Sequence, residues 1–218
     1  SDVCSSDLNA PCKKHMPALR PEELPELMRA LNTASIKLTT RCLIEWQLHT
    51  LSRPAEAAAA KWSEIDEVHK VWRIPAERMK KRRNHAVPLT PAMLSLLDVM
   101  RPISGDGEHI FPADRNPRKH LNEQTANMAL KRMGFKDRLV AHGLRSIGST
   151  ALNEHGFEAD LVEAALAHVD KDDVRGAYNR AEYIERRRPM MEWWSGYILA
   201  AASTSASLAS SSQTVVNL

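Results

Sequence analysis

The sequence predicts a mainly α-helical protein with one small antiparallel β-sheet, an α+β fold. Apolar residues recur with helical spacing over most of the 218 residues. Two short β-type runs flank a single basic turn near residue 80, and no alternation of strands and long helices indicates a parallel sheet. The content of 43% hydrophobic and 26% charged residues is ordinary for a globular protein, and this length can bury one good core or two small ones.

Three helices are expected before the sheet. "RPEELPELMRAL" starts with Pro21 in its first turn, where the missing N–H costs nothing, and its leucines share one face. "TTRCLIEWQLHTL" (39–51) predicts a mostly buried helix. "RPAEAAAAKW" restarts a helix at Pro54, which places Arg53 just before a helix N-terminus.

The pattern then changes to a hairpin, with Val71–Ile74 and Ala86–Leu89 as the two β-type runs. Further along the chain, Gly156 stands where a later helix should stop. The remaining segments have helical spacing: "PAMLSLLDVM", "NEQTANMALKRM", "HGLRSIGSTALNEH", "ADLVEAALAH" and "AEYIERRRPMMEWWSGYI".

These elements predict one domain over residues 16–198. Residues 1–15 have no periodicity and are expected to be a disordered or non-native tail, and the Ser/Ala-rich residues 199–218 a disordered one. No apolar run reaches the roughly 18 residues of a membrane span, and no signal peptide is visible, so we expect a cytoplasmic chain that does not bind membranes.

Basic residues are clustered rather than spread evenly. The net charge is only +3, but "ERMKKRRNH" (77–85), "RNPRKH" (115–120), "KRMGFKDR" (131–138) and "ERRRP" (185–189) form patches that suit an anionic partner. The three cysteines have no zinc-binding spacing, and the sequence contains no Gly-rich phosphate loop, so we expect neither a metal nor a cofactor.

One polar pair has spacing that suits phosphate binding. His142 and Arg145 are three residues apart at the start of a predicted helix, so both lie on one face. An Arg fork can hold two phosphate oxygens while the imidazole bonds the same group. The same spacing is common on solvent-facing helices, and Arg53 could simply pair with Glu56, so neither feature is decisive alone.

Three further residues complete a candidate set. Lys80 opens the basic turn, His168 ends an apolar helix, and Tyr178 follows ten residues later. Each has a structural alternative: a solvated lysine, a histidine that caps a helix C-terminus, and a core aromatic with its hydroxyl at the rim.

Taken in order, the set Arg, hairpin Lys, His-x-x-Arg, His and Tyr resembles the catalytic domain of the tyrosine recombinases, the phage integrase family. The similarity is greatest to integrases of prophages and genomic islands. It extends over roughly residues 20–198 and rests on "RPAEAAAAKWSEID", "ERMKKRRNHAVPLT", "HGLRSIGSTAL" and "ALAHVDKDDVRGAYNRAEYIERRRPMMEWW".

The resemblance implies a role for each residue. Tyr178 is the expected nucleophile, which attacks a DNA phosphodiester to give a 3′-phosphotyrosyl bond and a free 5′-hydroxyl. Arg53 and Arg145 are expected to hold the non-bridging oxygens, and Lys80 to protonate the leaving 5′-oxygen. His142 fits proton transfer at the tyrosine side.

His168 is expected to donate a hydrogen bond to a non-bridging oxygen. Two alternatives stay open: Lys81 in place of Lys80 if the hairpin register differs by one, and Tyr183 in place of Tyr178. The acidic pair in "KDDVRG" (171–176) is interpreted as a solvated turn because it sits in an apparent loop. Two arginines and a lysine can supply the positive charge that a metal would otherwise provide.

The implied function is a site-specific DNA recombinase, independent of metal and ATP, that integrates or excises a mobile element. Implied partners are duplex DNA attachment sites, three further copies of the chain on synapsed DNA, and DNA-bending accessory proteins, in a nucleoid-associated setting. Expected DNA contacts, taken from the basic clusters, are Lys81, Arg82, Arg83, Arg118 and Lys119.

Family members also carry N-terminal DNA-binding domains, and this chain begins just before the catalytic region. We therefore expect weak DNA binding by this chain on its own. Alternatives are a type IB topoisomerase-like nicking and closing activity and a truncated, non-catalytic DNA-binding remnant.

Overall fold

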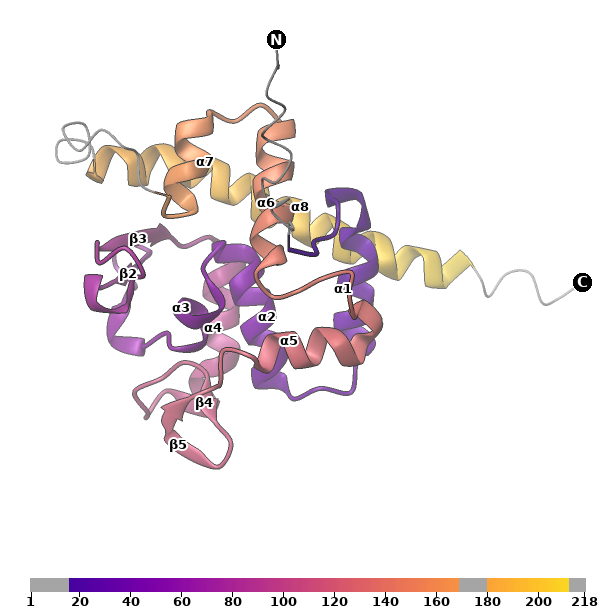
Figure 1. Cartoon of the computed structure of the whole chain (residues 1–218), viewed down its shortest axis with the longest axis horizontal. Coiled ribbons are helices and arrows are strands. Elements are labelled where there is room, and N and C mark those ends of the chain that lie inside the picture. The colour runs from indigo at the N-terminus through magenta and orange to yellow at the C-terminus, as the bar shows by residue number, and fades with distance from the viewer. Residues whose placement is uncertain (1–15, 169–179, 212–218) are drawn as a thin grey trace, which may run out of the picture.

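The structure is a computed structural model that describes residues 16–168 and 180–211, and Figure 1 gives its arrangement. It is mainly helical with small antiparallel sheets, which confirms the predicted fold class. The helices are α1 (Leu24–Thr33), α2 (Leu38–Thr50), α3 (Pro54–Ala58), α4 (Pro91–Ser104), α5 (Thr125–Leu130), α6 (Gly143–Glu154), α7 (Ala159–Ala165) and α8 (Arg180–Ser211). Short helical turns are η1 (Pro21–Glu23), η2 (Trp62–Glu64), η3 (Ala76–Arg78) and the π-helical η4 (Lys131–Phe135).

A three-stranded antiparallel sheet has the order β1–β2–β3. Its strands are β1 (Ile65–Asp66), β2 (Val71–Ile74) and β3 (His85–Pro88). The predicted first run is confirmed, and the second begins one residue early because His85 pairs with Ile74. The hairpin β2–β3 therefore joins residues 74 and 85 through the basic turn, as predicted.

A second hairpin was not predicted. Strands β4 (Pro112–Ala113) and β5 (Asn116–His120) pair antiparallel, and every residue of β5 is exposed. A strand with two exposed faces carries no apolar alternation, so its sequence "NPRKH" gives no strand signal. Figure 1 shows this hairpin projecting from the molecule on the side away from α7.

Helix α2 lies at the centre of the core. It contacts α3, α4, α5, α6 and α8, and nine of its thirteen residues are buried. A helix surrounded in this way is apolar on most sides, as the sequence of 39–51 predicts. Trp46 of α2 packs against Trp72 of β2, with ring centroids 5.2 Å apart, and so joins the helical core to the sheet.

Helix α8 crosses the molecule and closes the fold. It packs against α1, α2, α6, α7 and β3, and Figure 1 shows its C-terminal end reaching beyond α1. Trp194 is fully buried and donates from Nε1 to the carbonyl of Leu48 (2.9 Å), while Trp193 stacks on His155 at 4.1 Å. Both tryptophans thus pack the C-terminal helix.

The same helix continues beyond the predicted end of the domain. Residues 199–211, predicted to be disordered, belong to α8, and alanine, the strongest helix former, is frequent there. The predicted tail at 1–15 and the final residues 212–218 lie outside the described residues. None of the described helices is long and apolar enough to cross a membrane.

Gly156 ends α6 as predicted. It has φ +90°, and its N–H bonds the carbonyl of Asn153 while the N–H of Phe157 bonds that of Leu152. These two bonds form a Schellman stop, in which glycine takes the left-handed position at no steric cost.

Candidate active site

Arg53 is fixed at the N-terminus of α3 by a neighbouring carboxylate. Pro54 starts the helix, and the buried Glu56 accepts from the Arg53 backbone N–H (2.9 Å) and from Arg53 Nη1 (2.8 Å). The Arg53–Glu56 pair, which the sequence offers as the structural alternative for Arg53, is thus present. It orients the guanidinium through Nη1, and the Arg53 fork has further N–H donors that can bind a second acceptor.

Arg145, in the first turn of α6, is buried with only 3% of its surface exposed. Its Nη1 donates to the carbonyl of Leu51, and its Nη2 donates to the carbonyl of Leu166 (2.6 Å). Nη2 also lies 3.4 Å from Nε2 of His168. Among the described residues, none of these bonds goes to a carboxylate, so the charge of Arg145 has no direct counter-ion there.

The structure brings both histidines to this arginine. His168 follows α7, and its Nδ1 lies 2.6 Å from Glu163 Oε2, which turns Nε2 toward Arg145. His142 stands at the N-cap of α6 and is exposed. Partial desolvation of the imidazole, followed by the charges of Arg145 and Arg53, lowers the pKa of His142. The lowered pKa favours a neutral imidazole that can accept a proton.

The guanidinium groups of Arg53 and Arg145 are near enough for their charges to interact. Burial, followed by the charge of Arg53, lowers the pKa of Arg145 to about 10, while Glu56 and Glu163 act in the opposite direction. An anion placed between the two arginines would relieve their repulsion and satisfy the open donors.

Lys80 lies in the turn between β2 and β3, exposed together with Lys81, Arg82 and Arg83. All four are positioned to meet a polyanion at the surface, and Lys80 and Lys81 remain alternatives for the general acid. The other two predicted DNA contacts, Arg118 and Lys119, are exposed on β5, away from α7 (Figure 1). They form a separate basic surface and do not join the site.

Left-handed backbone conformations recur beside the candidate residues. Leu51, Arg82 and Ala167 have φ values of +56°, +48° and +52° without being glycine. They stand two residues before Arg53, two after Lys80 and one before His168. Such conformations cost about 1–2 kcal/mol each and concentrate at functional sites.

Two buried or half-buried basic residues near the site were missed by the sequence analysis. His85 is half-buried on β3, and burial, followed by the charges of Arg187 and Arg145, lowers its pKa to about 3. Arg187 of α8 is buried and donates to the carbonyls of Ala86 (2.7 Å) and Ala164 (3.4 Å). Arg187 belongs to a basic run that is typical of a solvated surface, so no sequence signal separates it from its exposed neighbours.

The predicted nucleophile, Tyr178, lies outside the described residues, as does the acidic pair at 172–173. Its alternative Tyr183 is in the first turns of α8, partly buried against the core, with the guanidinium of Arg186 5.8 Å from its ring centroid. In the described part of the chain, no group of three or more His, Cys, Asp or Glu side chains is placed to hold a metal ion.

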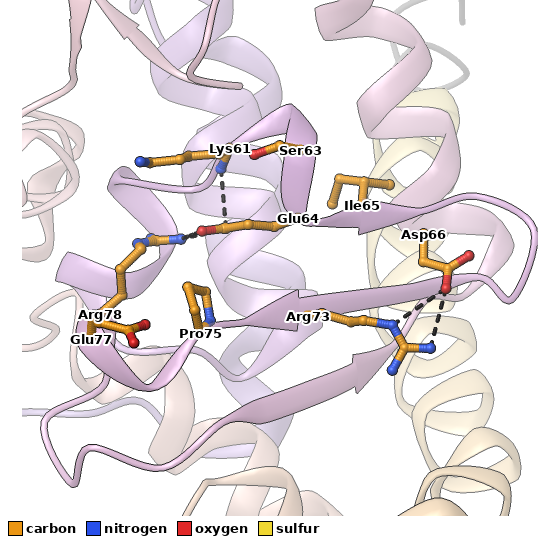
Figure 2. A pocket seen from close by; sticks show the side chains of 9 residues that line it. All are labelled: Lys61, Ser63, Glu64, Ile65, Asp66, Arg73, Pro75, Glu77 and Arg78. Atoms are coloured by element: carbon orange, nitrogen blue, oxygen red, sulfur yellow. Dashed lines mark hydrogen bonds and ion pairs between the residues drawn. The ribbon is translucent and has the colours of Figure 1, made fainter.

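A pocket of about 530 Å³ lies elsewhere, beside β1 and β2. Figure 2 shows its lining, in which Asp66 pairs with Arg73, and Glu64 pairs with Arg78. None of the five predicted catalytic residues that the structure describes lines it.

Comparison with known protein families shows which family the chain belongs to. The profile of the phage integrase family matches residues 17–185. The chain belongs to the phage integrase family. This membership confirms the resemblance that the order of the candidate residues along the chain indicates. The matched region includes every predicted catalytic position.

Among curated relatives, this integrase-family chain is 57% identical over 195 residues to the prophage integrase IntA of Escherichia coli (strain K12). The match covers 89% of this chain and 47% of the relative, so the chain spans about half the length of that protein.

Solved structures agree on the fold. The integrase from mycobacterium phage Brujita superposes with a TM-score of 0.63 at 19% identity, over 84% of this chain and 59% of that one. A lambda integrase tetramer bound to a Holliday junction gives a TM-score of 0.57 at 22% identity, over 76% of this chain and 51% of that one.

Proposed function

We propose that this chain is the catalytic part of a site-specific DNA recombinase that cuts and rejoins DNA through a 3′-phosphotyrosine. The observation that carries the proposal is the pair Arg53 and Arg145, held close together beside two histidines, with Arg145 bonded to backbone carbonyls rather than to a carboxylate. This is a binding site for an anion with several oxygens, and a DNA phosphodiester has that chemistry.

In the proposed reaction, the phenolic oxygen of Tyr178 attacks phosphorus and passes its proton to His142. The bond from phosphorus to the 5′-oxygen breaks, and Lys80 gives that oxygen a proton. The DNA 3′-phosphate stays on the tyrosine, and attack by a 5′-hydroxyl reverses the sequence. Because a phosphodiester is exchanged for another, no ATP is required.

Charge stabilisation is assigned to the arginines. Negative charge grows on the non-bridging oxygens in the transition state, and Arg53 and Arg145 supply fixed positive charge against it. Removal of one such donor typically lowers the rate about 10²- to 10³-fold. The proposed mechanism is therefore independent of a metal ion.

Duplex attachment sites are the proposed substrate, with four copies of the chain on synapsed DNA. The lambda integrase tetramer on a Holliday junction supports this assembly by analogy of fold. The exposed basic turn at 80–83 and the hairpin residues Arg118 and Lys119 are the proposed phosphate contacts, with DNA-bending proteins as accessory partners.

A suicide substrate tests the proposal. A duplex from the junction between the encoding element and its flanking DNA carries a nick beside the cleavage position, so that the cut end diffuses away and the covalent adduct accumulates. In EDTA, wild type and Tyr183→Phe are expected to form a protease-sensitive adduct, and Tyr178→Phe none. An adduct in Tyr178→Phe, or dependence on a divalent cation, would refute the mechanism.

A further inference from the structure

A largely buried ion pair lies two residues before Lys80, outside the set assigned to catalysis. Arg78 and Glu64 face each other with side-chain exposures of 15% and 6% (Figure 2). Glu64 also accepts from Trp72 Nε1 (2.9 Å) and from the backbone N–H of Lys61 (3.2 Å). A carboxylate with this many donors is held in one place, and it holds the guanidinium of Arg78 in turn.

The same guanidinium reaches the helix of Arg53. Arg78 Nη2 donates to the backbone carbonyl of Glu56 (2.7 Å), and the side chain of Glu56 makes the two bonds that orient Arg53. The rigid, planar fork of arginine presents donors in fixed directions, so Arg78 engages the Glu64 carboxylate and the Glu56 carbonyl at the same time. Arg78 therefore links the segment before Lys80 to the helix that presents Arg53.

Short-range contacts carry that link to the lysine. Arg78 is the last residue of η3, Met79 is buried, and Lys80 follows directly. The N–H of Arg82 bonds the carbonyl of Met79 (2.9 Å), and Asn84 Oδ1 accepts from the N–H of Ala76 (2.8 Å). The turn is thus tight and closed at its base, so a shift at position 78 moves position 80.

We propose that Arg78 is a positioning residue that fixes the Lys80 turn relative to the Arg53 helix. The inference rests on the proposed function, in which Arg53 binds the phosphate and Lys80 protonates the leaving 5′-oxygen. Two groups that act on one phosphate must be held in register, and a displacement of about 1 Å can cost about 10²-fold in rate.

The test separates leaving-group protonation from all other steps. The full chain is given two versions of the suicide duplex, one with the normal 5′-oxygen and one with sulfur at that bridging position. Thiols are far more acidic than alcohols, so the sulfur leaves as a thiolate without a proton from Lys80. Variants are Arg78→Met, Lys80→Ala and, as a matched control in the same pocket, the exposed Arg73→Met.

Arg78→Met is expected to slow adduct formation about 10- to 100-fold on the oxygen duplex and to return to within about threefold of wild type on the sulfur duplex. Lys80→Ala should show the same rescue, and Arg73→Met should match wild type on both. DNA affinity should not change in Arg78→Met, because the partly buried guanidinium is engaged by Glu64 and by the carbonyl of Glu56.

Equal slowing of Arg78→Met on both duplexes would overturn the inference, since a purely structural role does not depend on the leaving group. A normal rate on both would also overturn it. If Lys80→Ala is not rescued by sulfur, the assignment of Lys80 fails, and this inference fails with it. Rescue of Lys80→Ala without rescue of Arg78→Met overturns the inference alone.

A second variant decides the question if Arg78→Met does not fold, as judged by thermal unfolding. Arg78→Lys keeps a cation for Glu64 but cannot also reach the carbonyl of Glu56. The expected result is again a slow oxygen reaction with sulfur rescue. An Arg78→Lys variant as fast as wild type on oxygen would show that the link to Glu56 is not required, and the inference would fall.

Discussion

The stability of the fold is expected to fall below pH 6.5 through one buried histidine. His49 of α2 is 2% exposed, and its Nδ1 shares a hydrogen bond of 2.9 Å with Ser195 Oγ of α8. That hydroxyl lies 2.8 Å from the hydroxyl of Thr90, the N-cap of α4. Protonation of His49 would bury a charge at the junction of three helices.

The magnitude follows from the pKa difference. Burial lowers the pKa of His49 to about 4 from its ordinary value of 6.5. The unfolded chain therefore binds the proton first as pH falls, so the contribution of His49 is complete above pH 6.5 and is lost progressively toward pH 4. The linkage relation gives a loss of about 2 kcal/mol between pH 7 and pH 5.

Urea unfolding at pH 7, 6 and 5 measures this loss. His49→Gln keeps an amide for Ser195 but cannot titrate, so its stability should fall by about 2 kcal/mol less than that of wild type over the same interval. The difference between wild type and His49→Gln removes the contribution of the other titrating groups, which both proteins share. One of these groups is His85, whose pKa is also lowered. Equal pH dependence in the two proteins would refute the buried, neutral state of His49.

Three further substitutions test the site and its surroundings. Glu56→Gln weakens the two bonds that hold Arg53. It should slow adduct formation on the suicide duplex at least about 10-fold while DNA affinity is retained. An unchanged rate would contradict the role given to the pair. Gly143→Ala places a Cβ against the Pro17 carbonyl, closer than van der Waals contact, and should lower the free energy of unfolding by about 1–3 kcal/mol. An unchanged free energy of unfolding would contradict this close approach. Ala167→Gly relieves a left-handed alanine and should raise the free energy of unfolding by about 1 kcal/mol, and a loss would contradict that strain.

Much of the fold could be predicted because its signals are local. Helical spacing, prolines at helix starts and the glycine after α6 marked the helices, and the β-type runs around the basic turn marked the first hairpin. The hairpin β4–β5 gave no signal because no face of β5 is buried. The extension of α8 to Ser211 was not predicted, because this segment mixes serines, which favour turns and helix ends, with alanines, which favour helices.

The candidate site was predicted from order along the chain rather than from geometry. The structure places Arg53, His142 and His168 near Arg145, and Arg145 itself is held by carbonyls such as that of Leu51 that no sequence pattern specifies. The Arg53–Glu56 pair could be anticipated from its spacing, but the backbone acceptors of Arg145 and Arg78 could not. Arg78 acts through one backbone carbonyl 22 residues away in sequence, and a backbone acceptor leaves no trace in the residue types.

The identity of the residue that carries DNA tests the central claim most directly. Trypsin cleavage after arginine separates the candidates, because Tyr178 falls in the peptide 176–180 and Tyr183 in the peptide 181–186. Mass spectrometry of the digested adduct is predicted to find the 3′-phosphonucleotide on peptide 176–180. A nucleotide on peptide 181–186, or on any peptide without tyrosine, would contradict the mechanism.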